Sequence, residues 1–290
     1  MNSIKKMMLS GALGCLISGM AYADGSSPQP VKPYWQAIQV VAVNKEKPRS
    51  SFMSYADRET ALTSRFEKSP YYSLLNGTWK FFFVDSYKDL PQNITDPSVN
   101  TSSWDDITVP GNWEVQGHGV AIYTNHGYEF KPKNPQPPLL PEANPVGVYR
   151  RDIEIPASWD NRDIYLHIGG AKSGLYVYLN GKEVGYSEDS KNPAEFLINK
   201  YLQPGKNVLT LKIFRWSTGS YLECQDFWRM SGIERDVFLW SQPKASIQDF
   251  RVVSTLDDTY TNGIFKLAVD LKNHTQETKN LNVGYELLDA

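Results

Sequence analysis

Short segments in which apolar and polar residues alternate, or in which β-branched and aromatic residues gather, recur along the chain after residue 70. This pattern is typical of β-strands with one or both faces buried. The segments are 79–84, 104–112, 148–155, 164–168, 174–180, 182–186, 207–214 and 236–240. Turn residues separate them, and the Asn180-Gly181 pair favours a two-residue type I′ hairpin. Many short strands at near-regular spacing predict an all-β sandwich.

The segments on either side of these strands have other patterns. Residues 24–69 are polar, with prolines and isolated apolar anchors, and predict an extended N-terminal arm that wraps the next domain. A short helix is predicted within 55–68, where Asp57 can cap it. The chain ends with three further predicted strands, at 247–255, 263–271 and 281–288.

Three connections lie between the predicted strands. Residues 189–201 are predicted to form a loop and a short helical turn. The connection 118–145 contains six prolines from Pro132 to Pro145, and its length is typical of a functional or wrapping loop. The connection 214–237 holds charged and aromatic residues that no strand pattern requires. Because a rigid sheet positions the loops that it carries, we expect binding groups in this last connection.

The composition narrows the class of partner. The chain has 290 residues, 41% of them hydrophobic, and a net charge of −2, as in a globular protein of one or two domains. Its 30 Lys and Arg are balanced by 32 Asp and Glu without a basic block, so nucleic acid is not expected as a partner. Eight Trp and 17 Tyr fit a sugar-binding β-protein, although a packed sandwich core also uses aromatic residues.

The N-terminal residues have the three regions of a secretory signal peptide. Two lysines precede the apolar segment 7–20, and Ala21-Tyr22-Ala23 forms a small-x-small cleavage site before Asp24. The apolar segment is shorter than the roughly 20 residues that span a bilayer, so no membrane span is expected. Residues 1–23 are therefore predicted to be removed, and the protein is predicted to be secreted into the periplasm.

The cysteines bear on the same prediction. Cys15 lies in the leader, but Ala12-Leu13-Gly14 before it is a poor lipidation signal, so signal-peptidase cleavage is favoured. Removal of the leader leaves Cys224, and no intramolecular disulfide is expected in the mature chain despite an oxidising destination.

The run FRWSTGSYLECQDFWRMSGIERDV at 214–237 has the chemistry of a sugar site. Charged side chains lie among aromatic ones at Tyr221, Glu223, Asp226, Phe227, Trp228 and Arg229. Carboxylates accept hydrogen bonds from sugar hydroxyls, and aromatic faces pack against the C–H face of a pyranose ring. The alternative interpretation is a solvated salt-bridge network above packed aromatic residues.

The phrase RWSTGSYLECQDFWRMSGIERDVFL resembles the signature RWS-GSYLEDQD-WRMSGI-RDV-L of the family 2 glycoside hydrolases, in particular their large bacterial β-galactosidases. The match has no gaps and includes the rare residues Trp216, Trp228 and Met230. It extends to Trp79, VPGNW at 109–113, IYTN at 122–125 and NGKEVGY at 180–186. The resemblance therefore covers most of the chain after the leader.

The resemblance implies a jelly-roll, galactose-binding-like β-sandwich at 70–242, followed by an immunoglobulin-like β-sandwich. A complete sandwich of the second kind takes roughly 100 residues, and the segment 243–290 is shorter. We therefore expect 243–290 to be an incomplete, truncated immunoglobulin-like domain.

The resemblance also implies a retaining hydrolase. Retaining glycosidases use two carboxyl groups about 5 Å apart, and in this family both come from a (β/α)₈ barrel of about 250 residues after the immunoglobulin-like domain. The barrel does not fit in this chain, and the family's Asn-Glu dipeptide is missing from it. No catalytic residue is therefore assigned, and the chain alone is predicted to be inactive. Glu223 and Asp226 could form a catalytic pair, but the resemblance gives them positioning roles.

Two residues carry substrate contacts by resemblance. Asn125 corresponds to the asparagine of the IYTN motif that hydrogen-bonds the galactosyl group, and Asp226 to the aspartate that contacts galactose and ligates a sodium ion. An amide both donates and accepts hydrogen bonds, and a carboxylate is a hard oxygen ligand for an alkali cation. An amide that caps a turn is the alternative role for Asn125.

The chain departs from the family pattern at three positions. Cys224 stands where the pattern has Asp, Thr218 where Asp or Gly is common, and Glu188 where Gln is common. The residues Thr218 and Glu188 leave undecided whether this region holds a magnesium site. The four histidines, at 118, 126, 167 and 274, lack metal-ligand spacing, and His126 is the candidate for the rim of a site.

These observations predict the N-terminal sugar-binding part of a secreted β-galactosidase-type hydrolase, with a galactoside as partner. Two alternatives stay open: a stand-alone carbohydrate-binding module without catalysis, and a fragment that complements a separately encoded barrel. Glucuronides and mannosides as substrates, and the oligomeric state of the full-length enzyme, also stay open.

Overall fold

The computed structural model describes residues 33–131 and 134–288, so the signal-peptide prediction and Cys15 lie outside the described residues. The predicted all-β class is confirmed, since the described residues contain one short α-helix, α1 (Arg58–Leu62), among many strands. In this part of the chain no helix is both long and apolar enough to cross a membrane. Single 3₁₀ turns connect the strands: η1 (Tyr34–Gln36), η2 (Phe66–Lys68), η3 (Tyr87–Asp89), η4 (Glu114–Gln116), η5 (Ala157–Trp159), η6 (Asn199–Tyr201) and η7 (Thr218–Tyr221).

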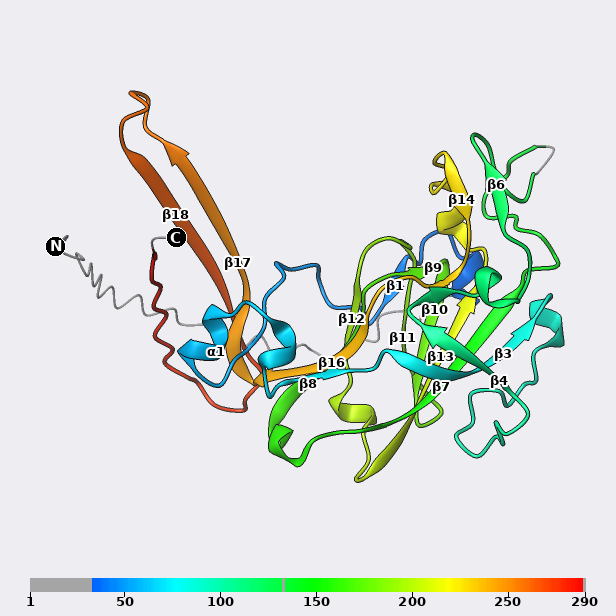
Figure 1. The fold of residues 1–290 in the computed structure, drawn as a ribbon, viewed down its shortest axis with the longest axis horizontal. Coiled ribbons are helices and arrows are strands. Elements are labelled where there is room, and N and C mark those ends of the chain that lie inside the picture. Colours follow the sequence, from blue (N-terminus) through cyan, green and yellow to red (C-terminus); the bar gives the residue numbers. More distant parts are fainter. Residues whose placement is uncertain (1–32, 132–133, 289–290) are drawn as a thin grey trace.

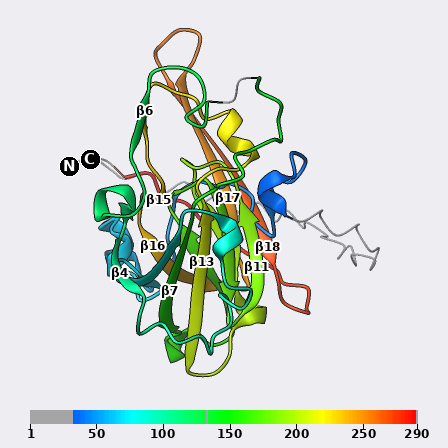
Figure 2. The same ribbon diagram turned by 90° about the vertical axis from the view of Figure 1, so that its right-hand side faces the viewer.

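Two antiparallel sheets form the body of the molecule (Figures 1 and 2). The larger one has the order β1 (Ala42–Val43), β11 (Lys182–Ser187), β10 (Gly174–Leu179), β13 (Lys206–Phe214), β7 (Val146–Glu154), β3 (Gly77–Val84) and β4 (Asp105–Val109). The smaller one has the order β12 (Ala194–Leu197), β8 (Arg162–Ile168), β16 (Val237–Pro243) and β2 (Tyr72–Leu74). The predicted Asn180-Gly181 hairpin joins β10 to β11, and both residues have the positive φ angles, 53° and 77°, of a type I′ turn.

Alternate residues of both sheets fill the space between them. Trp79, Phe81 and Leu211 from the larger sheet share one core with Leu166 and Phe196 from the smaller sheet, and each is at most 1% exposed. Burying a side chain of this size contributes on the order of 1.5–3 kcal/mol. The packed sandwich is therefore a rigid support for the loops at its rim.

The N-terminal arm packs against the other face of the larger sheet. Tyr34 stacks on Tyr176 with 5.6 Å between ring centroids, and Trp35 stacks on Phe214 with 5.0 Å. The arm also contributes strand β1, which pairs with β11 at the sheet edge. Further along, Asp57 caps α1, accepting a hydrogen bond of 2.8 Å from the Thr60 amide, as predicted. The arm is thus partly regular and joined to the sheet by backbone hydrogen bonds.

One prediction of secondary structure was right only in part, and another was wrong. The segment 189–201 contains the predicted loop and, at η6, the predicted helical turn, but its middle part is β12, because Ala194–Leu197 pairs with β8 and buries Ala194 and Phe196 in the core. The segment 281–288, predicted as a strand, has no strand assignment. A strand needs a neighbour to satisfy its backbone groups, and no strand of the described residues pairs with this one.

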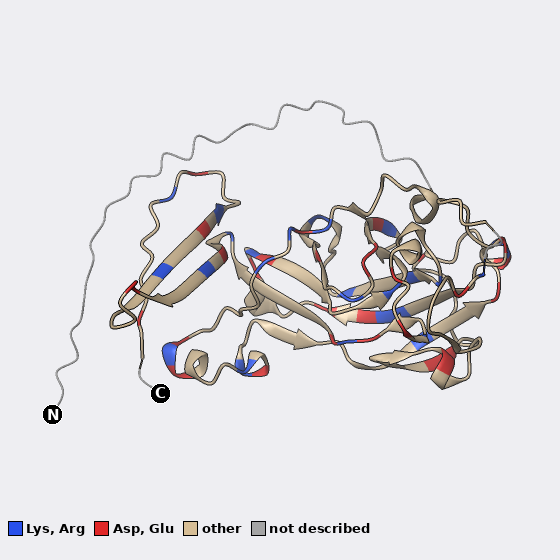
Figure 3. Ribbon diagram, turned by 90° about the horizontal axis from the view of Figure 1, so that it is seen from above, with Lys and Arg blue, Asp and Glu red and all other residues tan. Residues whose placement is uncertain are grey.

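The last strands form a separate hairpin, β17 (Ala245–Leu256) and β18 (Gly263–Asn273), which projects from the sandwich (Figure 1). Its base is held by a buried ion pair, in which Asp163 Oδ2 lies 3.1 Å from Lys272 Nζ, and the exposed His274 places Nδ1 2.7 Å from the same oxygen. Basic and acidic residues are interspersed along the elements rather than gathered by sign (Figure 3).

Candidate functional site

Two segments predicted as connections pair with each other. β6 (Ile122–Thr124) and β14 (Phe227–Arg229) form a two-stranded antiparallel ribbon, with Tyr123 opposite Trp228 and Thr124 opposite Phe227. The ribbon lies at the end of the sandwich far from the β17–β18 hairpin (Figure 1). Continuing this register by one residue places Asn125 opposite Asp226. The structure therefore brings the two sequence-predicted site residues together.

The alternation of side chains along the ribbon gives it two different faces. Tyr123 and Trp228 lie on the outer face and are 55% and 54% exposed, and their ring centroids are 5.7 Å apart. Asn125 and Asp226, two residues away on each strand, are exposed on the same side. The next residue along β14, Arg229, is 2% exposed and points inward.

Hydrogen bonds order the polar groups of the outer face. The Tyr123 hydroxyl donates to Asp226 Oδ1 at 2.7 Å, and this bond raises the pKa of Tyr123 above its ordinary value. Asn125 Oδ1 lies 2.8 Å from His126 Nδ1, and the Thr124 hydroxyl donates to the His126 carbonyl at 2.6 Å. His126 thus lies beside Asn125, and its place at the rim of a site stays a prediction. The result is an amide and a carboxylate next to two exposed aromatic rings.

Buried charges attach the inner face of the ribbon to the sandwich. Arg215 donates through Nη2 to the Arg229 carbonyl at 3.1 Å and to the Val120 carbonyl at 2.9 Å. Arg215 Nη1 also lies 3.6 Å from Glu114 Oε1. Burial raises the pKa of Glu114, while a hydrogen bond from the Ser231 amide opposes the rise. Strand β14 and the segment that leads into β6 are therefore tied to one buried arginine.

A small sheet continues this support: β5 (Gly111–Asn112), β15 (Gly232–Ile233) and β9 (Ala171–Lys172). Gly232 has a φ of +113°, and a Cβ there would lie 2.9 Å from both the Gly111 carbonyl oxygen and the Tyr149 hydroxyl. A side chain at Gly232 would therefore be strained and crowded. The glycine of the WRMSGI phrase has a structural role: it allows the chain to leave the ribbon and enter the core.

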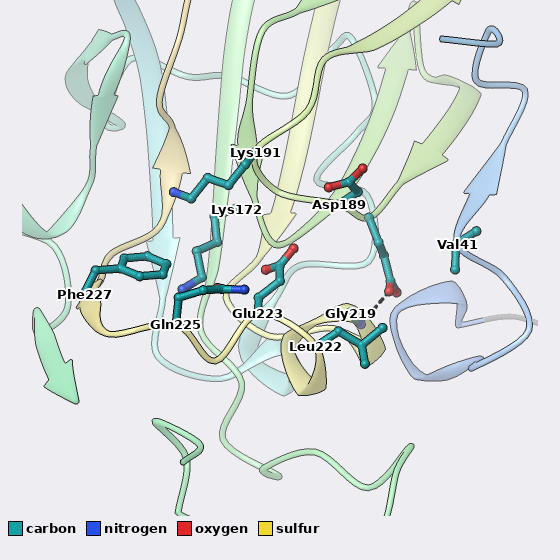
Figure 4. Close-up of a pocket in the computed structure, with 10 residues that line it drawn as sticks. Val41, Lys172, Asp189, Lys191, Gly219, Leu222, Glu223, Gln225 and Phe227 are labelled. Atoms are coloured by element: carbon teal, nitrogen blue, oxygen red, sulfur yellow. Dashed lines mark hydrogen bonds between the residues drawn. The ribbon is translucent and has the colours of Figure 1, made fainter. Parts of the chain in front are cut away.

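Glu223 and Asp226 do not form a pair in this structure. Glu223 accepts hydrogen bonds from the Ser190 amide at 2.8 Å and the Ser190 hydroxyl at 2.7 Å, and it lines a cavity (Figure 4). Asp226 lies on the outer face of the ribbon with Tyr123. The two carboxylates have separate surroundings, which argues against a catalytic pair.

Protein donors surround Glu188, one of the two positions at which the sequence left a magnesium site open. The Glu188 carboxylate is buried and accepts hydrogen bonds from the hydroxyls of Tyr186 and Thr218, at 2.7 and 3.0 Å, and from the Gly219 amide at 2.6 Å. Burial raises the pKa of this carboxyl group, whereas these hydrogen bonds lower it. Three protein donors occupy the oxygens that a cation would need. No group of three or more His, Cys, Asp or Glu residues within 33–131 and 134–288 is arranged to hold a metal ion.

Sequence reasoning missed two features of the site. One is the pairing of β6 with β14, which turns Tyr123 and Trp228 into an exposed aromatic pair beside Asn125 and Asp226. The signal was present as short alternating patterns in both connections, but three-residue strands are too short to recognise without their partner. The other is Lys172, whose ammonium group lines the cavity behind the ribbon.

A β-sandwich whose rim presents an amide, a carboxylate and exposed aromatic rings has the groups that a carbohydrate-binding domain needs. The family model described as "Glycosyl hydrolases family 2, sugar binding domain" matches residues 72–243. The chain belongs to glycoside hydrolase family 2 and contains the sugar-binding domain of that family.

The curated relatives are longer proteins. A β-galactosidase of Priestia megaterium is 40% identical over 255 residues, which are 87% of this chain and 25% of that protein. A β-galactosidase of Psychromonas ingrahamii is 36% identical over 256 residues, 88% of this chain and 24% of that protein. The chain thus spans about a quarter of the length of the curated relatives it matches.

Solved structures share the fold. The β-glucuronidase of Bacteroides uniformis superposes with a TM-score of 0.55 at 20% identity, covering 71% of this chain and 22% of that one. A β-glucuronidase of Bifidobacterium dentium gives 0.54 at 18% identity, covering 70% and 36%. At such identities the likeness concerns the fold alone.

Proposed function

We propose that this chain is the sugar-binding part of a retaining β-galactosidase-type glycoside hydrolase, which removes terminal β-D-galactosyl residues. The observation that carries the proposal is the outer face of the β6–β14 ribbon, where Asn125 and Asp226 directly adjoin the paired residues Thr124 and Phe227, next to the exposed rings of Tyr123 and Trp228. The curated relatives that match this chain are β-galactosidases, which supports a galactoside as the substrate.

Each group on this face has a role that its chemistry allows. The Asn125 amide can donate to one galactosyl hydroxyl and accept from another. Asp226 accepts from a hydroxyl and fits as one oxygen ligand of a sodium ion, since its carboxylate is exposed and has acceptor sites beyond the one that Tyr123 uses. The remaining ligands of such an ion would come from outside this face.

The domain organisation is part of the proposal. We assign the sandwich at 70–242 to a jelly roll and the β17–β18 hairpin to the beginning of an immunoglobulin-like domain. A stand-alone carbohydrate-binding module is the second candidate, favoured by the exposure of Tyr123 and Trp228. A fragment that complements a separate barrel would use the same face.

The purified chain should not hydrolyse nitrophenyl β-D-galactoside. Retaining chemistry needs two carboxyl groups about 5 Å apart, and Glu223 and Asp226 have separate surroundings. The assay uses protein from a host without its own galactosidase, with the Glu223→Gln variant prepared in parallel. Turnover that is present in the wild type and absent in this variant would contradict the expectation.

Export should remove residues 1–23, because lysines, an apolar segment and Ala21-Tyr22-Ala23 follow one another in the order of a signal peptide. N-terminal sequencing of the protein recovered from the periplasm should begin at Asp24. An intact Met1, or a lipid on Cys15, would rule out this cleavage.

A further inference from the structure

A cavity of about 590 Å³ lies behind the ribbon, on the side to which Phe227 points. This volume is within the range of roughly 300–1,000 Å³ that is usual for small-ligand sites. Strand β9, the loop after β11 and the run 219–227 contribute its walls (Figure 4). Asn125, Asp226 and Tyr123 do not line it. The cavity is therefore distinct from the outer face of the ribbon.

Lys172 lines the cavity, and the described residues do not use all the hydrogen-bond donors of its ammonium group. The residue is 2% exposed, and its Nζ lies 3.6 Å from Glu129 Oε2, which is too far for a hydrogen bond. Glu129 Oε2 is itself buried without a hydrogen-bond partner. Burial lowers the pKa of Lys172, and the charge of Glu129 opposes this effect. An ammonium group has three N–H donors, so an oxygen atom of a ligand in the cavity would accept a hydrogen bond that Lys172 otherwise lacks.

Acceptors and an amide face the same space. Figure 4 shows the side chains of Lys172, Glu223 and Gln225 converging. The Glu223 carboxylate accepts from Ser190 and keeps further acceptor positions, and the exposed Gln225 amide can both donate and accept. Phe227 and Leu222, which is 83% exposed, provide apolar wall.

The balance of charge indicates the class of ligand. Glu188, Asp189 and Glu223 line the cavity together with Lys172 and Lys191, so carboxylates outnumber ammonium groups by three to two. Lys191 is further neutralised by Glu234, which lies at 2.6 Å through Oε1. Such a lining has no excess positive charge to select an anion. It suits a neutral molecule whose groups donate and accept hydrogen bonds at once, beside one apolar face.

We propose that this cavity is a second carbohydrate site, which takes a neutral pyranose monosaccharide. Its hydroxyls lie between Lys172, Glu223 and Gln225, and its C–H face packs against Phe227. The site goes beyond the galactoside contacts of the outer face and needs no barrel residue.

The test is titration of the purified chain with D-galactose by calorimetry, with amide chemical shifts recorded in parallel. Wild type should bind with affinity on the order of millimolar, and shifts should move at Gly219, Leu222 and Gln225. Lys172→Met, which keeps the apolar stem, should weaken this binding about tenfold or more, and Gln225→Ala about fivefold. The exposed control Lys206→Ala should bind within about twofold of wild type. Thermal unfolding of each variant identifies a loss that is due to misfolding, and Gln225 is exposed enough for its variant to fold.

Three outcomes would overturn the second site. They are no binding by the wild type, shifts confined to the outer face and abolished by Asp226→Asn, and binding of D-glucuronate at least tenfold tighter than that of galactose. The second outcome would leave the proposed function intact, because it would place the sugar on the Asn125–Asp226 face. Conversely, if Asp226→Asn did not lower kcat/KM, the role of Asp226 in the proposed function would fail, and the galactose titration of the cavity would be unaffected.

Discussion

The Asp226→Asn variant should lose about ten- to a hundredfold in kcat/KM when the chain is part of a complete enzyme, formed with its own barrel or by fusion to that of a related β-galactosidase. The substitution nearly keeps the shape of the side chain and removes its charge. Asp226 lies on the exposed face of the ribbon, where a sugar hydroxyl and a cation can reach it, and Tyr123 holds one of its oxygens in place. Sodium dependence of the rate should weaken with the charge.

The control for Asp226 is Asp258→Asn, an exposed aspartate in the turn of the β17–β18 hairpin. It should leave kcat/KM and the response to sodium unchanged, because an exposed charge far from the site contributes little. Tyr123→Phe keeps the carboxylate but removes its hydrogen bond, so its loss should be smaller than that of Asp226→Asn. Measurement of kcat/KM for wild type and variants, in sodium and in sodium-free buffer, tests the role of Asp226. Less than about a fivefold difference from wild type, with parallel sodium responses, would remove Asp226 from the site.

Replacing Glu195 by Ala should destabilise the fold by roughly 3–5 kcal/mol, because several buried donors depend on this one carboxylate. Glu195 accepts from Arg49 through Nε and Nη2, both at 3.0 Å, and from the indole N–H of Trp240 at 3.0 Å. His167 Nδ1 lies 2.8 Å from the same carboxylate. Without it the largely buried guanidinium group of Arg49 loses its carboxylate partner. Thermal unfolding should show a fall in Tm of about 10 °C.

The stability contributed by Glu195 should also depend on pH. Burial by itself would raise the pKa of Glu195, but hydrogen bonds and charge from His167 and Arg49 outweigh it and hold the pKa below the ordinary value of 4.5. A carboxyl group whose pKa is lower in the folded state stabilises the fold above about pH 4.5 and loses this effect as the pH falls through the folded value. Wild type should therefore lose more stability between pH 5 and 3 than Glu195→Gln does.

Glu154→Ala is the matched control, since Glu154 is exposed on β7. Its unfolding free energy should lie within about 0.5 kcal/mol of wild type at every pH. Equal pH dependence in wild type and Glu195→Gln would show that Glu195 does not titrate as described.

The sandwich strands were accessible from the sequence because each is long enough to show its own pattern. The segments 79–84, 148–155 and 207–214 lie within β3, β7 and β13 or extend one residue past them, and the hairpin at Asn180-Gly181 follows from turn chemistry that only two residues determine. Local signals of this kind do not depend on the rest of the fold. The same holds for the long phrase at 215–239, from which the family could be named.

Pairing between distant segments was not accessible in this way. β12 was missed because four residues contain too little periodicity, and only its bonds to β8 make it a strand. The opposite error at 281–288 has the same cause, since an apolar pattern without a neighbouring strand does not form a ladder.

The candidate site also has one part that the sequence determined and another that only the tertiary structure determined. The sequence by itself determined that Asn125 and Asp226 are the residues to examine, because they stand in recognisable motifs. Only the tertiary structure decided that they adjoin the same two-stranded ribbon and that Tyr123 and Trp228 are exposed beside them, since β6 and β14 are about 100 residues apart and meet through backbone hydrogen bonds. It also decided that Glu223 belongs to a cavity with Lys172, because the hydrogen bonds that orient its carboxylate come from Ser190, which lies in a distant loop.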